Sequence, residues 1–350
     1  DFGYTWENQT LSIENNIYDI TFTDVNNGWA VGEYNSFYKT TDAGKSWNRV
    51  KIDESIDRWY RIHFFNADTG IAAKYTGTFY KTTNGGIDWF KFGEITDMQI
   101  NDLFFLNQNI GWITYWSKIN EYFIYKTTNG GENWTFQKAL QDSGMNALYF
   151  INENLGFAVG WDGIILKTTN GGQDWETNII DTVNFNDVVF INENVGWICS
   201  GWAGKNGKIL KTTDGGDNWT IQFSGDFEIR NICFANENSG WATTKSGEIF
   251  HTSDGGNNWA IQSHLTGKWL NAIYFLDEQN GWIAGNDGTI LKYSCTSTDV
   301  EENVPISENT DLQIYPNPAL NEITLFFPNT HNLNSISIFN SLGVEVKRIE

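Results

Sequence analysis

The sequence predicts an all-β protein: a seven-bladed β-propeller closed by its N-terminal strand, followed by a small, partial C-terminal β-sandwich domain. Three observations predict this fold class. A polar turn that ends in tryptophan recurs six times. A second motif, here called the glycine–aromatic motif because Trp or Phe follows the glycine in six of its copies, recurs seven times, and a phenylalanine lies six residues before each of its glycines. A period of about 42 residues with several short alternating stretches is typical of a four-stranded propeller blade.

The six tryptophan-ended turns, here called box turns, are eight residues long. They read TTDAGKSW (40–47), TTNGGIDW (82–89), TTNGGENW (127–134), TTNGGQDW (168–175), TTDGGDNW (212–219) and TSDGGNNW (252–259). Their third residues are Asp42, Asn84, Asn129, Asn170, Asp214 and Asp254, and their last are Trp47, Trp89, Trp134, Trp175, Trp219 and Trp259.

A structural role explains the composition of the box turns. An Asp or Asn side chain accepts hydrogen bonds from backbone N–H groups two residues on, and the following glycine adopts a positive φ at low cost. We expect the tryptophan to hold the turn against its blade. Because Asp and Asn exchange freely among the six copies, neither a catalytic carboxylate nor a ligand for a hard cation is indicated.

The glycine–aromatic motif interleaves with the box turns. Its glycines are Gly28, Gly70, Gly111, Gly156, Gly196, Gly240 and Gly281, and the matching phenylalanines are Phe22, Phe64, Phe105, Phe150, Phe190, Phe234 and Phe275. One unit illustrates the expected strands: FNDVVFI (185–191), GWICS (196–200), KILKTT (208–213) and WTIQF (219–223). β-branched and aromatic residues fill these stretches, whereas Asn, Asp and Gly fill the connections.

The seventh unit lacks a box turn and a fourth strand. The sequence YTWENQT (4–10) resembles the strands that follow the other box turns, such as NWTFQ and NWTIQ. We therefore expect the N-terminal strand to complete blade seven and close the ring, which removes the exposed strand edges.

The composition changes after residue 294, which gives three segments: a propeller (1–294), an acidic linker (295–311) and a C-terminal domain (312–350). The linker is polar and has no periodicity. The last segment contains two alternating runs, LQIYPNPALNEITLFF and SISIFNSLGVEV.

These motifs resemble known families. The box turns resemble the Asp-box, or bacterial neuraminidase, repeat, and together with the NENxGW motif they are most similar to the propeller of the photosystem II assembly and stability factor family. That resemblance implies a non-enzymatic, protein-binding propeller that uses an arginine-rich patch. Here Arg49, Arg58, Arg61, Arg230 and Arg348 are spread along an acidic chain, so the photosynthetic partner is not carried over.

The segment 312–350 resembles the C-terminal sorting domain of the type IX secretion system of Bacteroidota. The resemblance rests on the YPNP motif (315–318) and on IFNSLGVEV, while the family's final strands are missing, so we expect a truncated copy. It implies handling by the type IX machinery and a secreted or cell-surface protein.

Charge and composition narrow the partners. A net charge of −21 disfavours nucleic acid and anionic membranes, and no apolar run approaches the roughly 18 residues that span a bilayer. The chain begins at Asp1, so we expect an export signal to have been removed. Cys199 and Cys233 are expected in buried strands, the four histidines are scattered, and neither a metal nor a cofactor is predicted. We expect a monomer.

The face opposite the box turns is the expected binding face, because propeller ligands usually lie there. Aromatic residues fill its connections, and exposed rings offer flat contact area to a sugar or a protein. The predicted ligand-binding residues are Tyr34, Arg58, Tyr75, Trp116, Trp161, Asp162, Trp202, Trp269 and Asp287. For any one ring, packing over a hairpin end is an equally good explanation.

The sequence leaves two functions open. The first is a non-enzymatic propeller that binds an extracellular protein or glycan. The alternative is a secreted glycoside hydrolase of the Asp-box type, because Asp162 and Asp287 occupy matching hairpin tips and Asp19, Asp102 and Asp187 share one first-strand column. WDG and NDG are also ordinary turn sequences, and no catalytic triad or arginine cluster is apparent.

Overall fold

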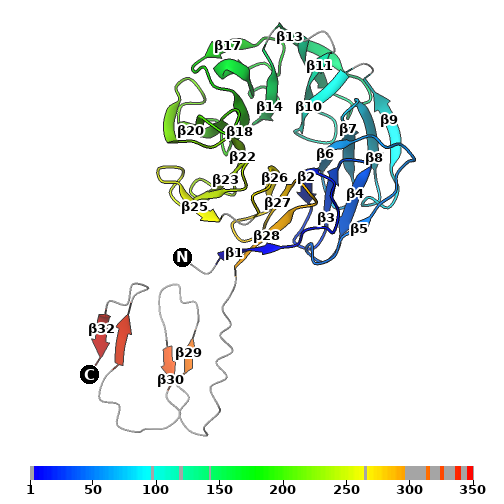
Figure 1. Ribbon diagram of the computed structural model, residues 1–350. Helices are drawn as coiled ribbons and strands as arrows, with labels where there is room; N and C mark the ends of the chain where they lie inside the picture. The colour runs from blue at the N-terminus through cyan, green and yellow to red at the C-terminus, as the bar shows by residue number, and fades with distance from the viewer. Residues whose placement is uncertain are drawn as a thin grey trace. The chain divides into compact units, whose positions relative to one another are not determined.

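The computed structural model describes residues 4–95, 98–117, 121–141, 143–263 and 266–295, together with four short strands further along the chain. The chain divides into two compact units, Asp1–Thr296 and Ser297–Glu350. The first unit is a ring of seven antiparallel four-stranded sheets around a central channel (Figure 1). The seven-bladed all-β fold predicted from the repeats is confirmed.

Four strands build each blade, numbered here from the inside of the ring outwards. Blades one to three contain, in order, β2 (Ile17–Phe22), β3 (Gly28–Gly32), β4 (Ser36–Thr40) and β5 (Asn48–Arg49); β6 (Trp59–Phe64), β7 (Gly70–Lys74), β8 (Thr78–Thr82) and β9 (Phe90–Glu94); and β10 (Met98–Phe105), β11 (Gly111–Ser117), β12 (Glu121–Thr127) and β13 (Thr135–Gln141).

Blades four to six repeat this order. They contain β14 (Met145–Phe150), β15 (Gly156–Gly160), β16 (Ile164–Thr168) and β17 (Glu176–Ile179); β18 (Phe185–Phe190), β19 (Gly196–Ser200), β20 (Gly207–Thr212) and β21 (Thr220–Gly225); and β22 (Ile229–Phe234), β23 (Gly240–Thr244), β24 (Ile249–Thr252) and β25 (Ala260–Ser263). A single 3-10 turn, η1 (Trp161–Gly163), joins β15 to β16.

Blade seven combines the two ends of the propeller. It contains β26 (Leu270–Phe275), β27 (Gly281–Gly285) and β28 (Ile290–Cys295), with β1 (Tyr4–Asn8) as its outermost strand. The register runs from Tyr4 opposite Cys295 to Asn8 opposite Leu291. Closure of the ring by the N-terminal strand therefore occurs as the sequence predicts (Figure 1).

Each box turn is fixed by its first and third residues. In the turn that begins at Thr168, the threonine hydroxyl donates to Asn170 Oδ1 at 3.0 Å and accepts the N–H of Gly172 at 2.8 Å. Asn170 Oδ1 in turn accepts the N–H of Asp174 at 2.9 Å. The predicted reach of two residues is thus wrong: the side-chain oxygen bonds four residues on, because two positive-φ glycines fold the chain back under it.

The box turns and the glycine-motif turns lie on the same face of the ring. In blade four, the N–H of Gly171 donates to the carbonyl of Asn154 at 2.8 Å. Equivalent bonds join Gly85 to Asp68 and Gly215 to Asn194. The opposite, box-free face is therefore formed by the second-to-third hairpins and by the connections that enter each first strand.

Aromatic stacking joins neighbouring blades. Trp112 of blade three stacks on Phe150 of blade four with ring centroids 3.4 Å apart, and Phe150 is edge-on to the box residue Trp175 at 5.9 Å. Trp282 of blade seven stacks on Phe22 of blade one at 3.5 Å, which continues the pattern across the closure. A Cβ atom on Gly156 would lie 2.3 Å from the Phe150 ring, so the glycine and phenylalanine columns depend on each other.

The second unit contains two described strand pairs. They are β29 (Gln313–Tyr315) with β30 (Thr324–Phe326), and β31 (Ile336–Phe339) with β32 (Glu345–Ile349). Almost all of the predicted acidic linker, 295–311, lies outside the described residues. Within the described part of the chain, no helix is long and apolar enough to cross a membrane.

Candidate binding face

Every first strand carries a β-bulge where it enters the ring from the box-free face. The register shifts lie at equivalent positions, for example between Met145 and Ala147 in blade four and between Phe185 and Asp187 in blade five. The bulge presents one side chain per blade at the mouth of the channel. These residues are Tyr18, Tyr60, Asn101, Asn146, Asn186, Arg230 and Asn271.

Asparagine amides at this mouth join consecutive blades. Asn101 donates through Nδ2 to the carbonyl of Met145 at 2.9 Å, and Asn146 donates to that of Phe185 at 2.7 Å. The same bond joins Asn186 to Ile229 at 2.7 Å, Asn231 to Leu270 at 3.1 Å and Asn271 to Ile17 at 2.9 Å. The amide donors are therefore engaged within the fold, while no described residue donates to the oxygens of these five amides, so the oxygens can accept from a ligand.

Three aspartates connect the blades one layer deeper. Asp19 accepts the N–H of Ile20 at 2.9 Å and that of Ile62 in the next blade at 2.8 Å. Asp187 makes the equivalent bonds to Val188 and Ile232. Burial raises the pKa of Asp19 to about 6 and that of Asp187 to about 7. Their geometry is that of structural acceptors between blades.

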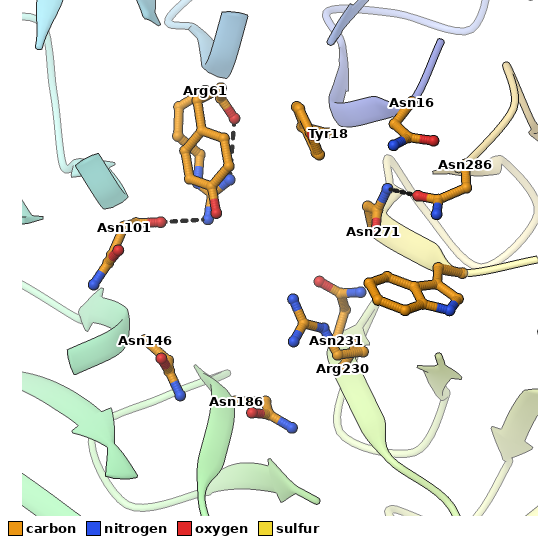
Figure 2. A pocket seen from close by; sticks show the side chains of 12 residues that line it. Asn16, Tyr18, Arg61, Asn101, Asn146, Asn186, Arg230, Asn231, Asn271 and Asn286 are labelled. Atoms are coloured by element: carbon orange, nitrogen blue, oxygen red, sulfur yellow. Dashed lines mark hydrogen bonds between the residues drawn. The ribbon is translucent and has the colours of Figure 1, made fainter. Parts of the chain in front are cut away.

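A polar hollow of about 230 Å³ occupies the box-free end of the channel (Figure 2). Amides of consecutive blades surround it, and Tyr18, Tyr60 and Trp269 complete its wall. Arg61 and Arg230, which are far apart in the sequence, both line it. The fold thus brings to one hollow two arginines that lie 169 positions apart in the sequence. No Asp or Glu is among the described residues that line the hollow.

The two arginines are held differently. Arg61 donates to Asp102 Oδ1 at 2.9 Å and to the carbonyl of Asn101 at 2.7 Å, and its guanidinium lies 4.4 Å from the Tyr60 ring centroid. Arg230 makes a longer bond, 3.4 Å, to the fully buried carboxylate of Glu228. Arg61 is thus fixed in place, and the more exposed Arg230 is freer to meet a ligand.

Aromatic residues extend outwards from the hollow across blades one to three. Tyr18 contacts Tyr60 with ring centroids 5.5 Å apart, and Tyr60 contacts Tyr75 at 5.3 Å. The Tyr75 hydroxyl donates to Gln99 Oε1 in β10 at 2.5 Å, so the tyrosine contacts reach blade three. Three predicted ligand-binding residues lie in this region: Arg58, Tyr75 and Trp116. The guanidinium carbon of Arg58 lies 5.2 Å from the ring centroid of Tyr75, and Trp116 is half-buried.

A second hollow of about 350 Å³ lies between the hairpins of blades four and five. Three predicted residues, Trp161, Asp162 and Trp202, line it, and both indoles are exposed. Lys245 of blade six connects this region to the central hollow, because its Nζ atom lies 6.0 Å from the Trp202 ring centroid and 4.2 Å from that of Trp269.

The remaining predicted residues lie elsewhere on the face. Tyr34 is exposed beside a hollow of about 400 Å³ between blades one and two, and Asp287 forms an ion pair with Lys268. Asp162 and Asp287 belong to blades four and seven and line no common hollow. The structure therefore gives no support to this pair as the two carboxylates of a glycosidase.

Nucleophile or metal chemistry finds little support on this face. Cys199 is buried and Cys233 half-buried, and burial raises the pKa of the Cys233 thiol to about 12. Burial also lowers the pKa of His63 to about 4. Among the residues that the structure describes, no three His, Cys, Asp or Glu side chains are grouped in a way that could hold a metal ion.

Among the side chains that surround the central hollow, sequence reasoning predicted Trp269 and missed the others. The signal was present: the residues four positions before the seven motif phenylalanines are Tyr18, Tyr60, Asn101, Asn146, Asn186, Arg230 and Asn271. Only the bulge reveals that this mixed column faces the channel, because regular alternation would leave its orientation undefined.

Fold and site together define a ring-closed β-propeller with a polar, aromatic face and a separate C-terminal unit. The family described as Photosynthesis system II assembly factor YCF48 matches residues 3–139, 137–224 and 221–294. The chain belongs to that family. A second family, the Secretion system C-terminal sorting domain, matches residues 313–350, which indicates export to the exterior or the cell surface. No curated protein matches the chain.

Solved structures of several functional classes share the fold. YCF48 bound to D1 peptide is 21% identical with a TM-score of 0.68, over 83% of this chain and 96% of that one. Virginiamycin B lyase from Staphylococcus aureus is 15% identical with a TM-score of 0.69, over 83% and 99%. The GH74 xyloglucanase from Xanthomonas campestris is 11% identical with a TM-score of 0.65, over 82% and 53%. At these identities the likeness concerns the fold alone.

Proposed function

We propose that this chain is an exported, non-enzymatic binding propeller that holds an extracellular protein or glycan on its box-free face. The observation that carries the proposal is the central hollow, which is lined by amides, two arginines and three aromatic residues, with no carboxylate among its described lining residues. Such a surface offers hydrogen bonds and flat contact area. The nearest carboxylates, Asp19, Asp102 and Asp187, line the adjoining deeper part of the channel, where each accepts a backbone N–H of the next blade. We further propose that the chain binds as a monomer.

Trp269 is central to the proposed site. It lines the hollow, its side chain is 48% exposed, and Lys245 stacks on its ring. Arg230 lies on the same wall, held by Glu228. In this arrangement the indole supplies contact area and the guanidinium supplies donors for carbonyl, carboxylate or hydroxyl groups. That one YCF48 structure holds a D1 peptide supports peptide binding by this fold, without identifying the ligand here.

The glycosidase alternative requires two carboxylates that flank one ligand site. Asp19, Asp102 and Asp187 each accept hydrogen bonds from their own strand and the next blade, or from Arg61, and so are engaged as structural acceptors. Asp287 is paired with Lys268. The GH74 likeness is one of fold, so no specific observation favours hydrolysis.

The test uses the full chain on glycan and peptide arrays. Trp269→Ala should weaken binding of any ligand found by about tenfold or more, as expected for a central aromatic contact. Ile87→Ala, an exposed residue in a box turn on the opposite face, should leave binding unchanged. Equal binding by wild type and Trp269→Ala would overturn the proposed site. Glycan hydrolysis that disappears in Asp162→Asn or Asp287→Asn would establish the enzyme instead.

A further inference from the structure

We propose that the hollow between blades four and five is a subsite for a neutral pyranose ring of a glycan. The proposal rests on the proposed function, because it assigns a ligand class to one part of the same face. Its elements are two exposed tryptophans, Trp161 and Trp202, and a polar edge formed by Asp162, Asn184 and Asn206.

Trp161 is a rigid platform. The backbone N–H of Trp161 donates to the carbonyl of Gly144 at 2.9 Å. The indole ring lies against the backbone of the same glycine, so that a Cβ atom on Gly144 would come within 2.7 Å of the ring. Tyr122 packs edge-on at 5.5 Å between ring centroids. Although these contacts fix the ring, 36% of the residue stays exposed. A fixed aromatic ring loses little conformational entropy when a ligand binds.

Trp202 provides the second platform from blade five. Its backbone is held by reciprocal hydrogen bonds with Lys205, 3.0 and 3.1 Å long, while its side chain is 59% exposed. The turn continues through Asn206, which has a φ of 58°. The structure thus presents a large aromatic side chain on an ordered turn at the edge of the hollow.

Asn184 braces the two hairpins. Its side-chain oxygen accepts the N–H of Asp162 at 3.2 Å, and its backbone carbonyl accepts the N–H of Gly201 at 3.0 Å. Asp162 adopts a left-handed conformation, with φ 54° and ψ 35°, at the edge of the hollow. Its carboxylate makes no hydrogen bond or ion pair with another described residue, which leaves both oxygens available to a ligand.

A neutral sugar fits this chemistry better than other ligands. The C–H face of a pyranose packs on an indole, and its hydroxyls pair with carboxylate and amide groups at the ring edge. Asp162 would repel an anionic sugar. A cationic ligand is disfavoured because Lys245 already lies 6.0 Å from the Trp202 ring. Val183 is the one aliphatic side chain that lines the hollow among the described residues, which suits an apolar peptide anchor poorly.

The experiment screens the full chain on an array of neutral gluco-, manno-, galacto- and xylo-oligosaccharides, and then measures the affinity of the best binder by calorimetry. Trp161→Ala and Trp202→Ala should each weaken binding by about tenfold or more, whereas Trp202→Phe should retain most of it. The matched control is Ile221→Ala, an equally exposed residue on the outer strand of blade five, which should change nothing. Trp202→Ala should melt within about 2 °C of wild type, which excludes misfolding.

Each remaining outcome overturns the subsite. The subsite is overturned if no neutral oligosaccharide binds. It is also overturned if both tryptophan variants still bind the glycan, or if the chain selectively binds trimethyllysine peptides and Trp202→Ala abolishes that binding. The two proposals can fail separately. Ligand binding that is sensitive to Trp269→Ala but not to Trp202→Ala removes the subsite and leaves the proposed function in place.

Discussion

The indole of Trp6 stands edge-on to the ring of Phe275, with 6.1 Å between ring centroids and 88° between the ring planes. Box tryptophans make the same contact in the other blades; Trp175 and Phe150, for example, lie 5.9 Å apart at 87°. Trp6 therefore takes the place of the box tryptophan that blade seven lacks. Phe275 is itself stacked on Trp241 of blade six, with 3.7 Å between ring centroids.

We predict that Trp6→Ala will destabilise the propeller by about 3–5 kcal/mol, because a buried tryptophan leaves a cavity. Trp175→Ala is the matched comparison, since both residues are 8% exposed, and it should cost a similar amount. Deletion of residues 1–10 should cost more, because it also exposes the edge of β28. Urea denaturation measures all three. A truncated chain as stable as wild type would refute closure by β1.

We predict that Asn186→Ala will lower the free energy of unfolding by about 1–3 kcal/mol, because two carbonyls lose their donor. The amide of Asn186 serves the carbonyls of Ile229 at 2.7 Å and Gly201 at 3.0 Å. Asn178→Ala, at an exposed position on the outer strand of blade four, is the control and should change stability by less than about 0.5 kcal/mol. Equal stability of the two variants would show that the amides do not join the blades.

The buried aspartates predict an unusual dependence of stability on pH. Burial raises the pKa of Asp187 to about 7, above its ordinary value of 3.8, so the folded protein binds this proton more tightly than the unfolded chain. Ionisation of Asp187 therefore lowers the free energy of unfolding progressively as the pH rises from about 4 to 7, and its contribution is constant above that range.

Asp187→Asn tests this dependence. In wild type, ionisation of Asp187 lowers the free energy of unfolding between pH 4 and 7, and the variant should not show this decrease. The stability of the variant relative to wild type should therefore rise as the pH increases from 4 to 7. The box aspartates act with the opposite sign, because hydrogen bonds from Ser46 and Asn218 lower the pKa values of Asp42 and Asp214 to about 2. The stability that Asp42 and Asp214 contribute as carboxylates is therefore lost as the pH falls from about 4 to about 2. Chemical denaturation at several pH values would give parallel curves for the two proteins if Asp187 were not involved.

We predict that a chain ending at residue 300 will keep the melting temperature and ligand binding of the full chain but will no longer be exported. The reason is that Asp1–Thr296 forms its own compact unit and the sorting domain matches residues 313–350. Calorimetry and cell fractionation measure the two effects. Loss of cooperative unfolding in the shortened chain would show that the propeller needs the tail.

The sequence was sufficient to predict the fold because the pattern of a single blade recurs seven times along the chain. Columns of glycine, phenylalanine and tryptophan fix the blade, and the resemblance of 4–10 to the strands after the box turns reveals the closure. The reach of the box side chain was misjudged because local turn chemistry does not show how two consecutive glycines fold the chain back. The turn type was predictable, and its hydrogen-bond pattern was not.

The candidate site could be predicted only in part. Exposed hairpin aromatics such as Trp202 follow from their position between strands, whereas the hollow depends on the bulge in each first strand. Arg61 and Arg230 approach the same space because a ring brings blades two and six around one axis, a relation that linear spacing does not contain. Partners such as Lys268 for Asp287 likewise emerge only after the connections are placed.

The pairing of β1 with β28 also bears on the order of events during synthesis. Tyr4 pairs with Cys295, so β1 finds its partner only after the last strand of the ring, β28, has been synthesised. The sorting domain begins at residue 313, shortly after that final strand. Any chain long enough to include the sorting domain therefore already contains every strand that is needed to close the propeller. A chain that ends before β28 would leave the ring open and would also lack the sorting domain.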